Sequence, residues 1–441
     1  MMMMKAASTL AFLLLARTAD GRRLSQEGAL DLDMEGNLIV ATPSMNRATQ
    51  ESLIGMQFSN DPYSGRDHYS MIVNGELNLS GLRYSPHSFK SIHNGDYYDV
   101  HGEFCVYDPT LNRSDPAGYA TSSAIMNESE HCAEHRYTLP LHEVMNAIKQ
   151  AEGTNKNMKT LPVSGLIFHE GYSGAGLISN ALATFPLNLV VAEHTALRDA
   201  LDACDVERNR YLVEDCSSTA QRRLIEDVVM LLSRTTDASS KHLYLKLSSG
   251  SSAYIPMMLD IYPDAAWSFV YRNAEDALAK TTERTRSSAC IKSRRNPSMA
   301  LFTKSSEHHV DLEGLTNTEV CSLYLSSLVD MATRVNEESG TGLLVSYDHE
   351  LLPTIITDSV LEVILPYFGL KQEIDADPML VREKVSKVLV QKSNNLARGG
   401  EGAPIWTKEE IHVSDEVKAA SSLFLKDSTD VLEVVARRKR A

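Results

Sequence analysis

The sequence lacks several features that would assign it to a common class of protein. Its 441 residues contain no apolar run of the roughly 20 residues that a membrane-spanning helix needs. Acidic side chains outnumber basic ones by 58 to 43, and the formal net charge is −15. There is no C-x-x-C pair of the kind found in zinc ribbons and thioredoxin-type redox sites. These absences argue against a membrane-spanning protein, a general binder of nucleic acids or anionic membranes, and a zinc ribbon.

The N-terminus has the pattern of a secretory signal peptide. Lys5 precedes an apolar stretch, Leu10 to Ala16, and Ala19-Asp20-Gly21 matches a small-x-small cleavage site. We therefore predict that residues 1–21 are a signal peptide and that the mature chain works in the Golgi lumen or outside the cell. Sequons for asparagine-linked glycosylation agree with this route and predict a glycoprotein; they begin at Asn78, Asn112 and Asn127.

The cysteine content also fits an oxidising compartment. There are six cysteines, at positions 105, 132, 204, 216, 290 and 321. Cys105 with Cys132, or Cys204 with Cys216, are disulfide candidates because they are close in sequence, although six cysteines allow about 15 complete pairings. Buried free thiols are the alternative.

The chain changes character near residue 158. Residues 22–158 are rich in Tyr, Asn, Asp, Ser and Gly and contain short alternating runs, which predicts a β-rich or irregular accessory region. A helical pattern begins at Leu141, and the polar segment from Gly153 to Thr160 is interpreted as a linker.

From residue 159 to 441, apolar strands alternate with amphipathic helices. This succession predicts an α/β fold, a three-layer sandwich with a central parallel sheet. The predicted strands are the segments GLIFHE, NLVVAEH, HLYLKLSS, AWSFVYR and TGLLVSY, which begin at residues 165, 188, 242, 266 and 341.

The most informative segment runs from Val163 to Ala183. An apolar strand leads into a turn with Gly171, Gly174 and Gly176, and a helical pattern follows. Glycines permit unusual φ angles and close backbone approach, and the first N–H groups of a helix attract anions. The segment predicts a phosphate-binding turn, with a simple glycine-rich connector as the alternative.

Two nucleotide-binding motifs fit this turn only in part. The spacing from Gly171 to Gly176 satisfies G-x-x-x-x-G, but Leu177 and Ile178 stand where a P-loop NTPase has Lys and Ser or Thr. A Rossmann-type enzyme that binds NAD or S-adenosylmethionine is the other possibility, with Glu193 as the acid that binds ribose.

A third interpretation covers more of the chain. The segment FHEGYSGAGLISNAL, from Phe168, resembles the phosphosulfate-binding turn of the sulfotransferase family, and later segments resemble that family's strands and helices in the same order. These begin at Asn188, Tyr244 and Tyr347, and a C-terminal ARGGEGAPIW segment resembles the loop that closes over the nucleotide. The resemblance covers most of residues 161–430. It implies an enzyme that uses 3′-phosphoadenosine 5′-phosphosulfate as co-substrate, needs no metal, and acts on a hydroxylated acceptor such as a glycan or small metabolite.

The resemblance assigns roles to individual residues. The turn residues, Gly171, Tyr172, Ser173, Gly174, Ala175 and Gly176, would surround the 5′-phosphosulfate. Arg272 would bind the 3′-phosphate, with Lys280 eight residues later in place of the usual Ser. Glu193 would activate the acceptor, and His169 is a second catalytic candidate. A purely structural role, at a helix start or a strand end, is the alternative for both.

Some positions depart from the family pattern. Tyr172 stands where the family has a Lys or Arg that stabilises the bridging oxygen, and Ala175 and Gly176 replace hydroxyl residues. Lys246, Arg284 or Arg286 are candidates to supply the missing cation. The departures favour a second hypothesis, a secreted binding module with a degenerate sulfotransferase fold.

No metal site is predicted. His131 and His135 have the spacing of one helix face, but the surrounding sequence does not indicate a helix and offers no third ligand. We expect these histidines to lie on a polar surface.

Overall fold

The computed structural model describes residues 31–32, 38–39, 63 and 65–440, with gaps at 91–93, 154, 156, 205–215, 284–288, 296 and 390–410. The chain divides into two compact units, Met1–Ser64 and Gly65–Ala441. In the first unit, β1 (Asp31–Leu32) pairs antiparallel with β2 (Leu38–Ile39). The predicted signal peptide lies outside the described residues.

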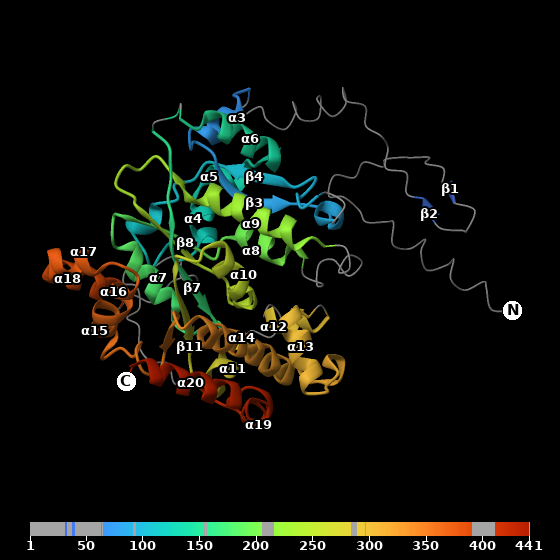
Figure 1. The fold of residues 1–441 in the computed structure, drawn as a ribbon, viewed down its shortest axis with the longest axis vertical. Helices are drawn as coiled ribbons and strands as arrows, with labels where there is room; N and C mark the ends of the chain where they lie inside the picture. Colours follow the sequence, from blue (N-terminus) through green and yellow to red (C-terminus); the bar gives the residue numbers. More distant parts are fainter. Residues whose placement is uncertain are drawn as a thin grey trace, which may run out of the picture. The chain divides into compact units, whose positions relative to one another are not determined.

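A five-stranded parallel sheet forms the centre of the second unit (Figure 1). Its strands, in order across the sheet, are β12 (Leu343–Ser346), β11 (Ala266–Tyr271), β7 (Val163–His169), β10 (His242–Lys246) and β8 (Asn188–Ala192). All neighbouring strands are parallel. Four of these strands lie within their predicted apolar segments and β7 begins two residues before its segment, so the predicted α/β fold with a parallel sheet is confirmed.

Both faces of this sheet are buried, which explains the nearly continuous apolar runs of its strands. On one face, Ile167 and Val270 pack with α7 (Ala175–Ala183) and with Phe368. The alternate residues point to the opposite face. There, Phe168 meets Trp267 edge to face, and both rings are buried. Helix α7 covers the first face, and the central parallel sheet with its flanking helices is consistent with the predicted three-layer sandwich.

Helices also flank the β12 edge of the sheet. The longest helix, α14 (Asn317–Ser339), packs against α19 (Asp415–Phe424) and α20 (Lys426–Arg440), which run beside it in Figure 1. Helix α20 also contacts β12. The other α-helices described after residue 250 are α10 (Ile255–Ile261), α11 (Ala274–Thr282), α12 (Ala289–Arg295), α13 (Met299–Glu307), α15 (Ile356–Ser359), α16 (Leu365–Tyr367), α17 (Lys371–Ala376) and α18 (Pro378–Leu389).

Residues 65–158 combine a small sheet with helices. Strands β3 (Asn78–Arg83), β4 (His101–Cys105) and β5 (Tyr137–Pro140) form an antiparallel sheet in that order. The helices are α3 (His68–Val73), α4 (Ser122–Glu128), α5 (Glu130–Glu134) and α6 (Leu141–Ala151). Strand β3 packs on α8 (Thr195–Leu201) and α9 (Ser218–Ser233) of the larger fold. The division of the chain near residue 158 stays a prediction.

Part of the predicted linker lies in a sheet. Its last two residues form β6 (Lys159–Thr160), which pairs antiparallel with β9 (Arg234–Thr235). The backbone of a short polar segment can complete its hydrogen bonds through such a pairing even when its side chains give no strand pattern.

All six cysteines form disulfides. Cys105 pairs with Cys132 and Cys204 with Cys216, so both candidate pairs are confirmed. The third disulfide joins Cys290 of α12 to Cys321 of α14. No cysteine is free, so the alternative of buried free thiols is wrong.

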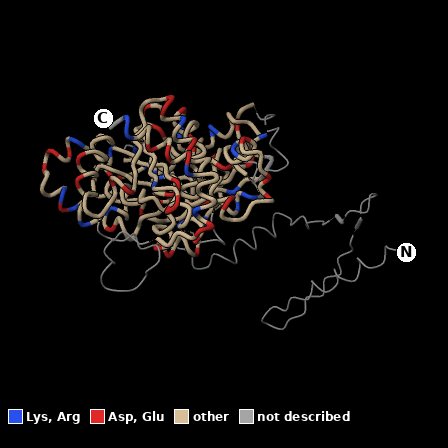
Figure 2. Tube along the Cα trace, turned by 90° about the horizontal axis from the view of Figure 1, so that it is seen from below, with Lys and Arg blue, Asp and Glu red and all other residues tan. Residues whose placement is uncertain are grey.

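The surface carries charges of both signs. Figure 2 shows acidic and basic positions scattered over the described trace. No helix of the described residues combines the length and apolarity needed to cross a membrane.

Candidate functional site

The glycine turn lies at the topological switch point of the sheet, where the strand order reverses. It follows β7, which has β11 on one side and β10 on the other. In open α/β sheets, ligands bind outside the carboxyl ends of the strands at such a switch point. The strand order also tests the Rossmann interpretation, in which the first two strands are neighbours. Here β10 lies between β7 and β8, so the Rossmann interpretation is wrong.

The turn is built from left-handed backbone conformations. Gly171, Tyr172 and Gly174 have φ angles of 104°, 49° and 87°. Gly174 is the N-cap of α7 and provides no side-chain cap. The N–H of Leu177 donates to the carbonyl oxygen of Gly174 at 2.9 Å, whereas the N–H groups of Ala175 and Gly176 lie before the first intrahelical acceptor. A Cβ on Gly176 would meet nothing within 4 Å, so space is open beside the helix start. These features suit an anion-binding turn.

Arg272, the first residue after β11, reaches this turn directly. Its Nη1 donates to the carbonyl oxygen of Tyr172 at 3.0 Å, and its guanidinium lies 4.2 Å from the centre of the Tyr347 ring. Its backbone N–H donates to Oε1 of Glu170 at 2.7 Å. The structure thus brings together the two places that the sequence assigned to opposite ends of one nucleotide.

Several buried polar atoms around the turn have no hydrogen-bond partner among the described residues. They include Oγ of Ser173, which is 1% exposed, Nε of Arg272 and Oε2 of Glu170. Buried polar groups are nearly always paired in folded proteins. A hydroxyl and a guanidinium N–H are donors that an anion can satisfy.

Glu170 would oppose an anion if it were charged. Burial raises the pKa of Glu170 to about 8, an effect that the hydrogen bond and charge of Arg272 only partly offset. At neutral pH this carboxyl is mostly protonated, so the local charge is dominated by the guanidinium of Arg272.

A second group of side chains gathers at the carboxyl ends of β7, β10 and β8. Nζ of Lys246 forms a hydrogen-bonded ion pair with Oε1 of Glu193, and Nε2 of His169 lies 3.7 Å from the same oxygen. Lys246 is buried, whereas the side chain of Glu193 is 34% exposed. Glu193 also has a φ of 51°, and strained backbone of this kind is frequent at functional sites.

The lysine keeps Glu193 ionised. Burial by itself raises the pKa of Glu193, but the charge and hydrogen bond of Lys246, with the nearby His169 and Arg198, outweigh it and hold the pKa below its ordinary value. Glu193 does not cap the following helix, because the N-cap of α8 is His194. Capping by His194 agrees with the structural alternative for Glu193, a carboxylate at a helix start beside local capping by its neighbours, and the catalytic role of Glu193 stays a prediction.

His169 has a defined tautomer. Its Nδ1 accepts from the N–H of Gly171 at 3.0 Å, so the ring proton is on Nε2, which donates to the carbonyl oxygen of Leu247 at 2.9 Å. Burial lowers the pKa of His169 to about 4, so the ring is neutral at neutral pH. Both ring nitrogens are engaged, and the ring links the glycine turn to the end of β10.

Lys280 lies apart from these contacts, and several other predicted residues lie outside the described part of the chain. Lys280 is on α11 and forms an ion pair with Glu283 at 3.2 Å. Tyr172 is 46% exposed at the turn. Arg284, Arg286 and the ARGGEGAPIW segment are not among the described residues.

The sequence did not single out two residues that complete the site, Tyr347 and Asp348. Tyr347 packs on the Arg272 guanidinium, and Oδ2 of Asp348 accepts from the N–H of Asn273 at 2.8 Å. Both follow directly after β12, the neighbour of β11. Their place after an apolar run was the available signal, but only the strand order shows that this run ends beside Arg272.

The described residues contain no cluster of His, Cys, Asp or Glu side chains that could hold a metal ion. His131 lies in α5, so the prediction that this segment is not helical was wrong. Its Nδ1 accepts from the N–H of Val106 at 3.2 Å.

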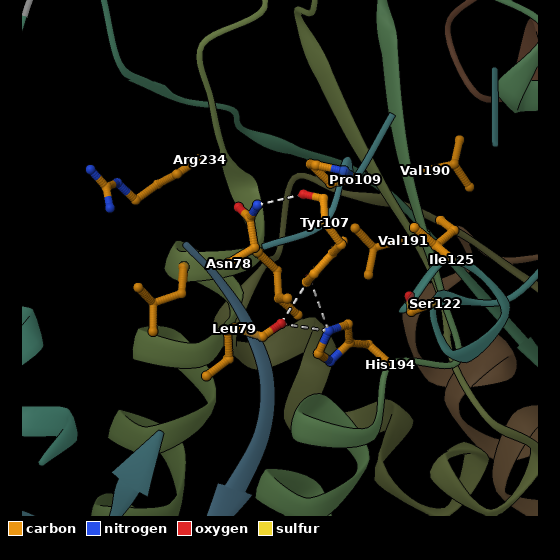
Figure 3. A pocket seen from close by; sticks show the side chains of 12 residues that line it. Asn78, Leu79, Tyr107, Pro109, Ser122, Ile125, Val190, Val191, His194 and Arg234 are labelled. Carbon is orange, nitrogen blue, oxygen red and sulfur yellow. Dashed lines mark hydrogen bonds between the residues drawn. The ribbon is translucent and has the colours of Figure 1, made fainter. Parts of the chain in front are cut away.

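A small cavity lies away from the glycine turn, between β3 and β8 (Figure 3). Asn78, Tyr107 and His194 are among its lining residues, and it has room for about one water molecule. A cavity of this size cannot hold a nucleotide.

Comparisons with known proteins give distant structural neighbours. No protein-family model matches the sequence, and no curated protein matches it. The fold is similar to the sulfotransferase STF9 from Mycobacterium avium, with 11% identity, a TM-score of 0.41, and coverage of 85% of this chain and 97% of that protein. It is also similar to a sulfotransferase from Alicyclobacillus acidocaldarius, with 12% identity, a TM-score of 0.30, and coverage of 62% and 96%.

Proposed function

We propose that this protein binds 3′-phosphoadenosine 5′-phosphosulfate at the turn between β7 and α7 and transfers its sulfuryl group to a hydroxylated acceptor. One observation carries the proposal: the Arg272 guanidinium lies against the glycine turn, and its unpartnered Nε and the unpartnered Oγ of Ser173 are both buried there. Two donors in this setting call for an anionic ligand. The resemblance of the sequence to sulfotransferases supplies the identity of that ligand.

The turn would hold the 5′-phosphosulfate. The amides of Gly174, Ala175 and Gly176 and the hydroxyl of Ser173 are the proposed donors, since the start of α7 has no side-chain cap. Arg272 would bind the 3′-phosphate through its unpartnered Nε while Nη1 stays on the turn. Lys280 would add a more distant charge from α11.

Glu193 would act as the base. Its carboxylate is ionised and partly exposed, so it can accept the proton of an acceptor hydroxyl as the oxygen of that hydroxyl attacks. When bound, the co-substrate supplies the sulfuryl group and the bisphosphate leaving group. Lys246 keeps Glu193 charged, and His169, with both nitrogens bonded, would orient the turn rather than exchange a proton.

A degenerate binding module is the second candidate, and a specific observation favours it. Tyr172 stands where the family has a cation, and the two buried cations at this end of the sheet, Arg272 and Lys246, already have protein partners. Binding without turnover would follow if neither cation can reach the transferring group. In both cases the predicted signal peptide and the three disulfides support a protein of the secretory pathway.

Titration calorimetry with 3′-phosphoadenosine 5′-phosphate tests the proposal. We expect one binding site in folded protein and a marked loss of affinity in Arg272→Ala. No detectable binding to protein with native circular dichroism would overturn the cofactor assignment. Transfer of radiolabelled sulfate that is lost in Glu193→Gln would separate the enzyme from the binding module.

A further inference from the structure

The asparagines of the three sequons differ in exposure and in the hydrogen bonds that their side-chain amides form in the folded protein. We infer that Asn127 is the residue that accepts an asparagine-linked oligosaccharide, whereas Asn112 and Asn78 use their side-chain amides to hold the fold together. The inference rests on the predicted secretory route and is independent of the nucleotide site.

The modification itself defines what the asparagine must provide. A bond forms between the anomeric carbon of the sugar and Nδ2, and the bond from that carbon to the pyrophosphate of a lipid-linked oligosaccharide breaks. The amide loses one proton and the lipid pyrophosphate leaves. In the folded product Nδ2 must therefore face solvent with room for a bulky, hydrated group.

Asn112 cannot meet this condition in the folded protein. It lies in a 3₁₀ turn (Leu111–Arg113), is 5% exposed, and donates from Nδ2 to the carbonyl oxygen of Val190 at 2.8 Å. Arg113 beside it donates from Nε and Nη2 to the carbonyl oxygen of Asn188 at 3.0 and 2.8 Å. Both acceptors belong to β8, the edge strand of the central sheet.

These two side chains protect that edge. A free sheet edge presents unpaired carbonyl and N–H groups to other chains, and proteins cover such edges. Asn112 and Arg113 satisfy two carbonyls of β8 from outside the sheet. A sugar on Nδ2 of Asn112 would have to displace this contact.

Asn78 is also engaged. It is the first residue of β3, and its Nδ2 donates to the carbonyl oxygen of Tyr107 at 2.8 Å beside the small cavity (Figure 3). The hydroxyl of its sequon, Ser80, is buried and donates to the carbonyl oxygen of Glu103. The cavity has room for about one water molecule, not for a sugar.

Asn127 differs from both. It lies in the last turn of α4 and is exposed, and no hydrogen bond of its side chain is found within the described part of the chain. Its sequon ends at Ser129, which caps α5 through the N–H of Cys132. A sugar at this position leaves the backbone, the cap and the Cys105–Cys132 disulfide unchanged.

The test is secretion of the full chain from a eukaryotic cell, with a grafted signal peptide if the native one is inactive. Intact mass is measured before and after digestion with a peptide N-glycosidase, for the parent and for Asn127→Gln, Asn112→Gln and Asn78→Gln. We expect one removable glycan in the parent, none in Asn127→Gln, and one in each of the other two variants. Asn112→Gln should also lower the midpoint of thermal unfolding. Asn127→Gln should unfold with the same midpoint as the enzymatically deglycosylated parent.

A folded, secreted parent without a glycan would overturn the inference. So would a glycan on Asn112 or Asn78, or a glycan that survives Asn127→Gln. If Asn112→Gln is not secreted, digestion of the parent in ¹⁸O-labelled water marks each formerly glycosylated asparagine, and the label on any residue other than Asn127 would contradict the assignment.

Discussion

Arg272 and Tyr172 are joined by a hydrogen bond of 3.0 Å from Nη1 to the main-chain carbonyl. Tyr172 has a φ of 49°, a conformation that costs a bulky residue about 1–2 kcal/mol. The arginine at the end of one strand therefore helps to hold a strained turn that follows the neighbouring strand. Because the same guanidinium retains a free Nε, its support of the turn and its contact with a ligand are not mutually exclusive.

Arg272→Lys should weaken binding of 3′-phosphoadenosine 5′-phosphate by roughly tenfold or more, because an ammonium group cannot contact the turn and a phosphate with the same fork of donors. Titration calorimetry measures the change. Arg234→Lys is the matched control, since Arg234 also donates to backbone carbonyls, those of Ile72 and Val73 in the accessory region. Equal losses in both variants would mean that the effect is one of folding.

Lys246→Met should move the acidic limb of the pH–rate profile to higher pH. The lysine lowers the pKa of Glu193, and without it the burial that remains raises this pKa, so a higher pH is needed to ionise the base. The profile of the rate of sulfate transfer against pH tests this, with Lys246→Arg as the variant that keeps the charge. An unchanged acidic limb in Lys246→Met would remove Glu193 from the proposed base role.

Stability should fall as pH rises from about 4.5 to about 8, through Glu170. The folded protein holds this proton up to a pKa of about 8, whereas the unfolded chain releases it near the ordinary value of 4.5. The folded state thus binds more protons in this window, and the free energy of unfolding decreases across it by an amount on the order of a few kcal/mol.

Glu170→Gln should remove this contribution, because the amide keeps the acceptor for the Arg272 N–H and cannot ionise. Urea unfolding at pH 5 and pH 8.5 measures the difference between the two proteins. Glu76→Gln, which alters a surface ion pair with Arg66, serves as the control and should behave as the parent does. A Glu170→Gln protein with the parent's pH dependence would contradict the assignment.

Tyr172→Lys should increase sulfuryl transfer by about tenfold or more, if the chain turns over at all. It restores a cation at the exposed position of the turn, and single preorganised donors at reacting oxygens typically contribute 10²–10³ in rate. Tyr172→Phe is the control, because it changes the hydroxyl and adds no charge. A lysine that lowers both binding and transfer would indicate that the tyrosine itself contacts a ligand.

The sequence by itself determined the local parts of this protein. Apolar runs bounded by turns marked all five strands of the central sheet, and the left-handed turn from Gly171 to Gly174 could be predicted because glycine alone adopts such angles freely. The pairs Cys105–Cys132 and Cys204–Cys216 were candidates because short separations along the chain limit how far the sulfurs can move apart. These features depend on residues that are close in sequence.

Only the tertiary structure decided which of these parts meet. Nothing local in β10 says that it lies between β7 and β8, yet this order rejects the Rossmann interpretation and sets Lys246 against Glu193. Local sequence also does not indicate that Tyr347 packs on Arg272 or that Asn112 binds the edge of β8. Strand order and contacts between strands join segments that are tens of residues apart. The free energy that selects this arrangement comes from burial of the whole sheet, so it cannot be predicted from any single segment.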